Sequence, residues 1–214
     1  MTYSFLDIAR TPSVKAAEAA NGSERYFDDF RGDRRFDRFG AAEAQFIAAR
    51  DSFYMATVSQ TGWPYVQHRG GPPGFLRLLD DKMLAFADFR GNRQYITLGN
   101  ATANDRAALI LMDYPNRRRM KIYARIEARD LAADPDLAAK LSLPGYKAKP
   151  ERALLLHLEA FDWNCPQHIT PRFTEAEIGV ALQPTLTRLA ALEAENAALK
   201  AKLRAGEQPS GDAG

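Results

Sequence analysis

Two short segments of the chain place arginine among glycines and small polar residues, which suits a ligand that carries phosphate. The first is QHRGG, residues 67–71, and the second is DFRGNRQ, residues 88–94. Glycine lets the backbone approach a ligand closely, and arginine offers a planar fork of donors that matches phosphate oxygens. If the fold brings the two segments together, they suit the phosphate and polar edge of a flat, anionic cofactor.

The residues that must position these arginines have the pattern of a β-meander. Residues 53–59 are rich in aromatic and β-branched residues, and Gln60-Thr61-Gly62 follows as a turn signal. The pattern resumes at 63–67, where Pro64 lacks an N–H and suits a strand start or a sheet edge. Further strands are predicted at 75–79 and 83–87. Both arginine segments are therefore predicted to be turns after strands.

More strands and several helices are predicted around this meander. The later strands are expected at 106–113, 120–128 and 153–161, with Arg117-Arg118-Arg119 in a turn. Helices are expected at 13–20, 41–50, 94–103 and 134–141. The segment 25–39 is dense in aromatics, arginines and aspartates. It is interpreted as a surface segment with anchoring aromatics, or as a wrap over the domain or a partner subunit.

Composition predicts a soluble globular protein. The 214 residues include 29 Lys and Arg and 27 Asp and Glu, a net charge of +2 that argues against binding to nucleic acid. Cys165 is the single cysteine, so no intrachain disulfide is expected, which suits a protein of the reducing cytoplasm. The Cys165 thiol is expected to be buried and inert. No leader and no bilayer-spanning apolar run is recognised, and the three histidines are too scattered for a metal site.

Four ordered motifs give the chain a family resemblance. They are QHRGGPPGF at Gln67–Phe75, FADFRGNRQYI at Phe86–Ile96, LMDY followed by arginines at Leu111–Arg119, and WNCPQHI followed by an arginine at Trp163–Arg172. The chain resembles the pyridoxamine 5'-phosphate oxidase-like family of flavin-binding split barrels, in an uncharacterised branch. The opening Asp7–Ser23 also fits that branch, and the resemblance covers roughly residues 5 to 175.

The resemblance implies a mainly β fold with peripheral helices, an α+β arrangement around a six-stranded split β-barrel. It implies a homodimer with each FMN in the cleft between subunits. The expected organisation is a helical segment at 1–52, the FMN-binding barrel at 53–175, a C-terminal helix at 176–205 and a disordered tail at 206–214. The cofactor-binding residues are expected to be His68, Arg69, Gly70, Gly71, Ala87, Asp88, Phe89, Asn92, Arg93 and Gln94.

The expected phosphate site departs from the wider family at one position. In the wider family, an arginine followed by a lysine binds the flavin phosphate. Arg93 aligns with that arginine, but Gln94 stands in place of the lysine. Phosphate binding is therefore expected to depend on Arg93, Arg69 and neutral donors such as Asn92, because glutamine cannot replace the positive charge of lysine. The alternative for Arg93 is a surface arginine at a helix start.

Other candidates each have a structural alternative. His68 is either an acid or base near neutral pH or, as preferred here, a structural hydrogen-bonder. Asp88 and Phe89 give backbone contacts to the flavin ring, or Phe89 is core. The arginine run 117–119 reaches the cofactor or an acidic substrate, or is a solvated turn. Trp163, Gln167, His168 and Arg172 match the region where the family covers the ring and binds substrate.

The C-terminal segment has a heptad pattern. Leu182, Leu189, Asn196 and Leu203 recur every seven residues, and Leu192 and Leu199 follow three residues after Leu189 and Asn196. An asparagine at an a position favours a parallel, in-register pair, and Arg188–Glu193 and Glu195–Lys200 would attract between chains. The prediction is self-association as a coiled coil; the alternative is an amphipathic helix lying on the domain.

Two classes of function follow. The first is an FMN-dependent oxidoreductase with an unidentified small-molecule substrate or electron donor and with catalytic residues still to be assigned. The second is a non-catalytic flavin-binding or electron-relay module that docks to a partner through its C-terminal helix. Gln94 and a different C-terminal motif argue against a true pyridoxamine phosphate oxidase. The sequence contains no G-x-G-x-x-G motif after a strand, so a nicotinamide-binding Rossmann domain is not expected.

Overall fold

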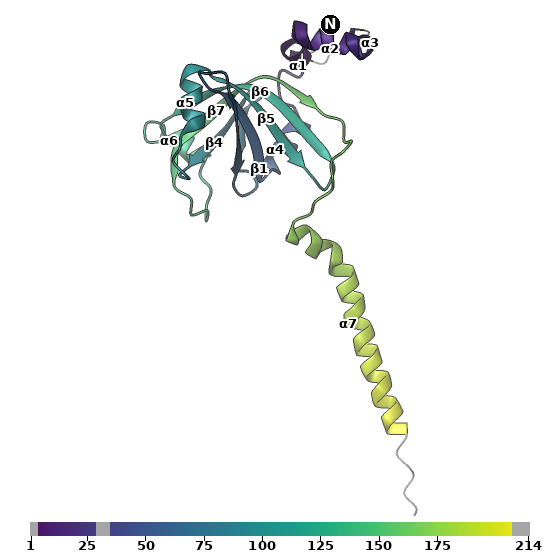
Figure 1. Ribbon diagram of the computed structural model, residues 1–214. Helices are drawn as coiled ribbons and strands as arrows, with labels where there is room; N and C mark the ends of the chain where they lie inside the picture. Colours follow the sequence, from purple (N-terminus) through teal and green to yellow (C-terminus); the bar gives the residue numbers. More distant parts are fainter. Residues whose placement is uncertain (1–3, 29–34, 207–214) are drawn as a thin grey trace, which may run out of the picture. The chain divides into compact units, whose positions relative to one another are not determined.

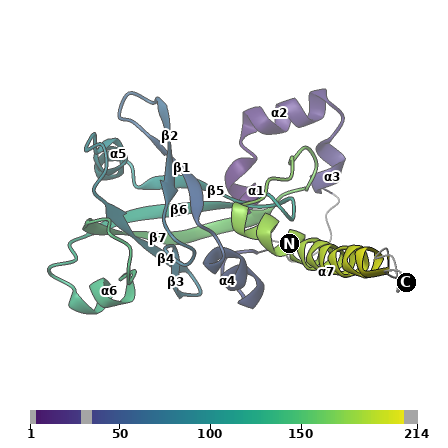
Figure 2. The same ribbon diagram turned by 90° about the horizontal axis from the view of Figure 1, so that it is seen from below.

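Seven antiparallel strands form one curved sheet in the order β2-β1-β5-β6-β7-β4-β3 (Figure 1 and Figure 2). This computed structural model describes residues 4–28 and 35–206. It divides the chain into two units, Met1–Thr170 and Pro171–Gly214, of which the first holds the sheet. The strands are β1 Ser52–Val58, β2 Pro64–Gly70, β3 Arg77–Asp80, β4 Met83–Phe89, β5 Arg106–Asp113, β6 Arg118–Arg129 and β7 Pro150–Trp163.

Side chains alternate between the two faces of the sheet, as the period of a strand requires. In β1, Phe53, Met55 and Thr57 are buried, whereas Tyr54 and Val58 on the opposite face are exposed. The strand pairs with β2 along its whole length, from Ser52 opposite Gly70 to Val58 opposite Pro64. This register fixes which β2 side chains share the buried face of β1 and which share the exposed face.

The sheet curls around a core to which helices also contribute. Helix α4, Ala41–Ala48, lies next to β3 and inserts Phe46 and Ile47 into the main cluster (Figure 2). Phe36 and Phe39 pack on Phe161 of β7, with ring centroids 5.0 and 5.2 Å apart. A smaller cluster lies where α6, Pro135–Lys140, covers β4 and β7.

Three short helices precede α4 in the described part of the chain. They are α1 Ser4–Ala9, α2 Pro12–Ala20 and α3 Glu24–Asp28. Phe5 of α1 stacks on Tyr123 of β6 with ring centroids 4.6 Å apart, and Arg10 pairs with Glu18 of α2 at 2.8 Å. Within the predicted surface segment 25–39, residues 29–34 lie outside the described residues, and Phe36 and Phe39 act as the anchoring aromatics.

The sheet confirms the mainly β, split-barrel prediction and corrects its details. There are seven strands, not six. Strand β2 continues through His68, Arg69 and Gly70, because pairing with β1 extends to Ser52, so the first arginine segment is a strand end rather than a turn. Strand β6 likewise begins at Arg118, and β3 begins only at Arg77.

The second unit contains one helix, α7, Glu175–Gly206. A capping box begins it: the Thr174 N–H donates to Glu177 Oε2 at 2.8 Å, and the Glu177 N–H donates to Thr174 Oγ1 at 3.2 Å. Pro184 lies inside the helix. No helix among the described residues is long and apolar enough to cross a membrane. Beyond Gly206, the predicted disordered tail lies outside the described residues.

Gly71 is required by packing, which gives a first testable prediction. A Cβ at residue 71 would lie 2.8 Å from Cβ and Cγ of the buried Phe75. Gly71→Ala should therefore lower the free energy of unfolding by about 1–2 kcal/mol through overpacking, as measured by urea denaturation. Gly99→Ala is the control, because a Cβ there meets nothing within 4 Å. Equal stability of the two variants would contradict the packing role of Gly71.

Candidate functional site

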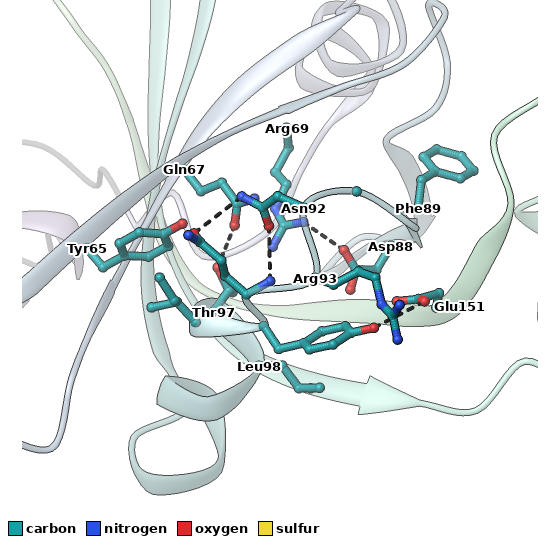
Figure 3. Close-up of a pocket in the computed structure, with 14 residues that line it drawn as sticks. Tyr65, Gln67, Arg69, Asp88, Phe89, Asn92, Arg93, Thr97, Leu98 and Glu151 are labelled. Atoms are coloured by element: carbon teal, nitrogen blue, oxygen red, sulfur yellow. Dashed lines mark hydrogen bonds and ion pairs between the residues drawn. The ribbon is translucent and has the colours of Figure 1, made fainter.

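The two arginine segments meet in one shallow cleft between β2, the end of β4 and the start of α5, Ile96–Ala103 (Figure 3). The cleft contains about 420 Å³ of empty space, continuous with solvent. Only about 50 Å³ of it is space that a water-sized atom can enter, which is below the roughly 300–1,000 Å³ common for small-molecule sites, so the cleft of the single chain is shallow. Its walls are formed by Tyr65, Gln67, Arg69, Asp88, Phe89, Gly91, Asn92, Arg93, Gln94, Tyr95, Ile96, Thr97, Leu98 and Glu151.

Strand β2 contributes every second residue to this wall. Tyr65, Gln67 and Arg69 line the cleft, whereas Val66 lines a separate apolar hollow on the other side of the sheet. His68 also lies on that other side, with its ring 5.5 Å from the ring of Tyr54. The alternation of side chains along a strand thus separates His68 from Arg69, although the two are adjacent in sequence.

An ionic cluster forms the inner end of the cleft. Arg69 Nη1 lies 2.7 Å from Asp88 Oδ1, and Arg152 Nη1 lies 3.3 Å from Asp88 Oδ2. Arg152 Nη2 also lies 3.5 Å from Glu151 Oε2, so two guanidinium groups and two carboxylates meet here. The Nε of Arg69 is buried and has no hydrogen-bond partner among the described residues. One donor in the cleft wall is therefore left over for a ligand.

The opposite wall is the loop that leads into α5, and its backbone is strained. Arg93 has φ 61° and Tyr95 has φ 51°, in the left-handed region that non-glycine residues seldom adopt. Tyr95 is the N-cap of α5 and makes no side-chain cap bond, so the first N–H groups of the helix keep free donor capacity at the cleft. Strain of this kind clusters at ligand sites.

Two hydrogen bonds fix α5 against the sheet. The Thr97 hydroxyl donates to Gln67 Oε1 at 3.1 Å, and Asn100 Nδ2 donates to Thr57 Oγ1 at 2.9 Å in a buried contact. Because both bonds join α5 to β1 or β2, the start of the helix and the Arg69 wall keep a fixed separation.

Arg93 is exposed at the mouth of the cleft. A hydrogen bond with the Tyr95 side chain raises its pKa, and Glu151 adds a smaller effect in the same direction. Tyr95 in turn donates its hydroxyl proton to Glu151 Oε1 at 3.2 Å, and Arg90 Nε lies 3.5 Å from that oxygen. An exposed arginine with these partners can turn toward an anion without leaving a buried charge behind.

Six of the ten predicted cofactor-binding residues line the cleft: Arg69, Asp88, Phe89, Asn92, Arg93 and Gln94. The other four lie elsewhere. His68 is on the opposite face of β2, Gly70 and Gly71 pack against His68 and Phe75, and Ala87 is buried in the smaller core cluster. These four residues do not line the cleft, and their role in binding stays a prediction. The Asp88 carboxylate pairs with Arg69 and Arg152, and the expected backbone contact of Asp88 with a flavin ring stays a prediction.

Several lining residues were not predicted. Tyr65 and Gln67 could have been found from the period-2 alternation that ends at Arg69. Glu151 could not, because β7 reaches the cleft only through its pairing with β4, in which Asp88 lies opposite Arg152. Tyr65 and Glu151 stand in no local motif that points to a ligand, whereas Gln67 is the first residue of the QHRGG segment.

The remaining candidates are placed outside the cleft. The guanidinium of Arg118 lies over Trp163, 4.5 Å from the ring centroid, and 5.3 Å from that of Phe46, so it serves packing. Cys165 is exposed, not buried as expected, because it follows the end of β7. The described residues hold no cluster of metal-ligating side chains.

The cleft is chemically suited to hold an anionic ligand. Its walls offer guanidinium, amide, hydroxyl and backbone N–H donors, and none of the lining residues is a histidine or cysteine. These groups can bind and orient a ligand. They include no side chain of the type that transfers protons near neutral pH.

Comparisons with known proteins point in one direction. The family model described as pyridoxamine 5'-phosphate oxidase matches residues 39–159, more than half of the chain. This stretch contains β1 to β6, most of β7 and both arginine segments. None of the curated proteins compared with the chain matches it.

Three solved structures illustrate the similarity. An FMN-binding protein from Syntrophomonas wolfei is 12% identical, with 72% of this chain and 95% of that chain covered and a TM-score of 0.44. An FAD-binding protein from Mesorhizobium loti is 15% identical, with 59% and 94% covered and a TM-score of 0.40. A Clostridium acetobutylicum protein related to general stress protein 26 is 16% identical, with 63% and 92% covered and a TM-score of 0.39.

Proposed function

Because this chain belongs to the pyridoxamine 5'-phosphate oxidase family, whose members bind flavins, we propose that its cleft holds FMN and that the protein is an oxidoreductase acting on a small molecule. The observation that carries the proposal is that Arg69 and Arg93, 24 positions apart, line one cleft together with the start of α5. An anionic cofactor would find charge and backbone donors there in a fixed arrangement.

The residues present fit a flavin phosphate. Arg93, Asn92 and the first N–H groups of α5 would hold the phosphate, and the unpartnered Nε of Arg69 would donate to another polar atom of the cofactor. Gln94 gives a neutral donor where the wider family has lysine. Phe89 and Leu98 supply apolar surface, and Tyr65 supplies a ring.

When bound, a flavin supplies hydride and single-electron transfer, and the protein supplies binding, orientation and electrostatics. Here the ionic cluster of Arg69, Asp88 and Arg152, to which Glu151 also belongs, would hold the Arg69 guanidinium in place at the inner end of the cleft. The bonds from α5 to the sheet would hold the cleft open in a constant shape. We assign no proton-transfer role to a residue of this chain.

The proposal includes a homodimer whose interface lies on the face of β2 opposite the cleft. An apolar patch, defined by Tyr54, Val66 and Ile110, lies on the outer face of β1, β2 and β5, where these side chains are 42%, 60% and 36% exposed. Exposed apolar patches of this kind mark interaction sites. Strand β2 therefore contributes one face to the proposed flavin site and the other to the proposed subunit interface.

The decisive experiment is the absorption spectrum of the purified protein, followed by extraction and identification of the chromophore. FMN bound in about one equivalent per chain supports the proposal, and protein that stays colourless after incubation with FMN contradicts it. Anaerobic mixing with NADH, NADPH or candidate substrates then separates the two classes. Rapid bleaching of the flavin supports an oxidoreductase, whereas slow, unselective reduction favours an electron-relay module.

The dimer gives a separate prediction. Val66→Thr keeps the shape and β-propensity of residue 66 but adds a hydroxyl that would be buried without a partner in both subunits. At about 1 kcal/mol for each copy, the dissociation constant of the dimer should rise by about tenfold or more, as measured by sedimentation. Val14→Thr, on α2, is the control. A dimer unaffected by Val66→Thr would place the interface elsewhere.

A further inference from the structure

We propose that the α7 helices of two copies of this chain pair in parallel and in register, as a two-stranded coiled coil over residues 182–203. This goes beyond the proposed function, since neither the cleft nor the apolar patch requires it. Five leucines form the seam: Leu182, Leu189, Leu192, Leu199 and Leu203. Each is between 43% and 67% exposed in the single chain. A seam of this length is apolar surface that a partner helix would cover.

The distribution of charge distinguishes this seam from an ordinary surface helix. Between residues 188 and 202 the charged residues are Arg188, Glu193, Glu195, Lys200 and Lys202, and all five stand at the e and g positions that flank the seam. The outward positions b, c and f from 190 to 201 are all alanine. A helix lying on its own domain would instead carry its charges on the outward face. Charges that flank the seam are typical of pairing between helices.

The charges are complementary to a second copy of the same helix. In a parallel pair, residue g of one helix faces residue e of the next heptad in the other. Arg188 then faces the partner's Glu193, and Glu195 faces the partner's Lys200. By two-fold symmetry each attraction occurs twice. Self-complementarity identifies the occupant of the seam as another α7.

Asn196 sets the orientation. It stands at an a position in the middle of the seam, where it faces its own counterpart only if the helices are parallel and in register. The two amides can then bond to each other. In an antiparallel pair Asn196 would face a leucine and leave a buried amide unsatisfied, which is costly. Pro184 stands at the outward position c near the start of the seam, and the hydrogen bond that it removes is to residue 180, so the seam from Leu189 to Leu203 lies beyond its effect.

Disulfide trapping in the full chain tests both the pairing and its orientation. Cys165 is exposed, so all variants carry Cys165→Ser. Leu203→Cys places a thiol in the seam, and Ala201→Cys, at position f, is the matched control on the outward face. Under mild oxidation we expect about tenfold more disulfide-linked pairs at residue 203 than at 201, because a disulfide needs Cα atoms within about 7 Å. Equal linking at the two positions would overturn the pairing.

Co-expression of Leu192→Cys and Leu203→Cys chains, with different tags, tests the opposite orientation. In a parallel, in-register pair residues 192 and 203 are separated by about 16 Å along the axis, at 1.5 Å per residue, so mixed links should be rare. Mixed links in excess of 203–203 links would mean that the helices are antiparallel and would reject the proposal.

Charge reversal gives an independent test that needs no cysteine. Glu195→Lys alone, or Lys200→Glu alone, puts like charges opposite each other in a homodimer. In a pair that contains one chain of each variant, both g–e contacts attract again. Co-expressed chains should form mixed pairs in about fivefold excess over random assortment at low salt, because four exposed contacts change sign. Random assortment at low salt would show that these residues do not meet.

Discussion

Replacing Asp88 with alanine is expected to lower the free energy of unfolding by about 3–5 kcal/mol, the largest effect predicted for a residue of the cleft. The reason is burial. The side chains of Arg69, Asp88 and Arg152 are 14%, 12% and 19% exposed. In this largely dry environment Arg69 would lose its carboxylate partner, and Arg152 would keep only its contact with Glu151 at 3.5 Å. Breaking a buried ionic contact from one side leaves an uncompensated charge, which costs more than the contact contributed.

Urea denaturation of the apoprotein measures this effect without a contribution from the cofactor, and a fixed protein concentration keeps the contribution of dimer dissociation equal in the variants compared. Asp105→Ala is the matched control. Asp105 also pairs with an arginine, Arg125, at 3.0 Å, but both side chains are more than 40% exposed. That variant should lose no more than about 1 kcal/mol. Similar losses in the two variants would show that the Asp88 cluster is solvated and adds little to stability.

Replacing Arg93 with alanine should weaken FMN retention by about ten- to a hundredfold. A charge-assisted hydrogen bond to phosphate is worth about 1.5–3 kcal/mol, and each 1.4 kcal/mol changes the dissociation constant about tenfold. Fluorescence titration of the apoprotein with FMN gives the constant. The free energy of unfolding should change little. Arg93 is exposed, and an alanine at residue 93 would adopt the same left-handed φ at a similar cost.

Arg90→Ala separates a specific phosphate contact from a general loss of charge. Arg90 is on the same loop and is also exposed, but it pairs with Glu151 at 3.5 Å and does not line the cleft. Its removal should change FMN affinity by less than about threefold, through long-range charge alone. Riboflavin, which lacks the phosphate, should bind Arg93→Ala as well as it binds the unaltered protein. Unchanged FMN affinity in Arg93→Ala would remove Arg93 from the site.

Local sequence patterns predicted most of the sheet because each strand has its own signal. The aromatic and β-branched run in β1 and the apolar run in β5 are recognisable without knowledge of their neighbours. The end of β2 is different. Gly70 and Gly71 suggested a turn, but the pairing of Gly70 with Ser52 keeps the chain extended, and Gly71 is glycine because Phe75 leaves no room for a Cβ.

The composition of the cleft was predictable only in part, for a related reason. Arg69 and Arg93 stand in local motifs, and strand alternation places Gln67 on the same face as Arg69 and His68 on the other face. Arg152 reaches Asp88 through the pairing of β4 with β7, across 64 residues of chain. No local pattern encodes such a contact, so the ionic cluster had to be found in three dimensions.

The left-handed backbone of Arg93 and Tyr95 has a consequence for how the loop would evolve under different pressures. Glycine or asparagine adopts such a φ more easily, and each strained residue costs about 1–3 kcal/mol. A library randomised at residues 93 and 95 and selected for survival of heating without cofactor should therefore accumulate glycine and asparagine at both positions. The same library selected for yellow colonies should retain arginine at 93. The two outcomes would separate what the fold prefers at this loop from what the ligand demands of it.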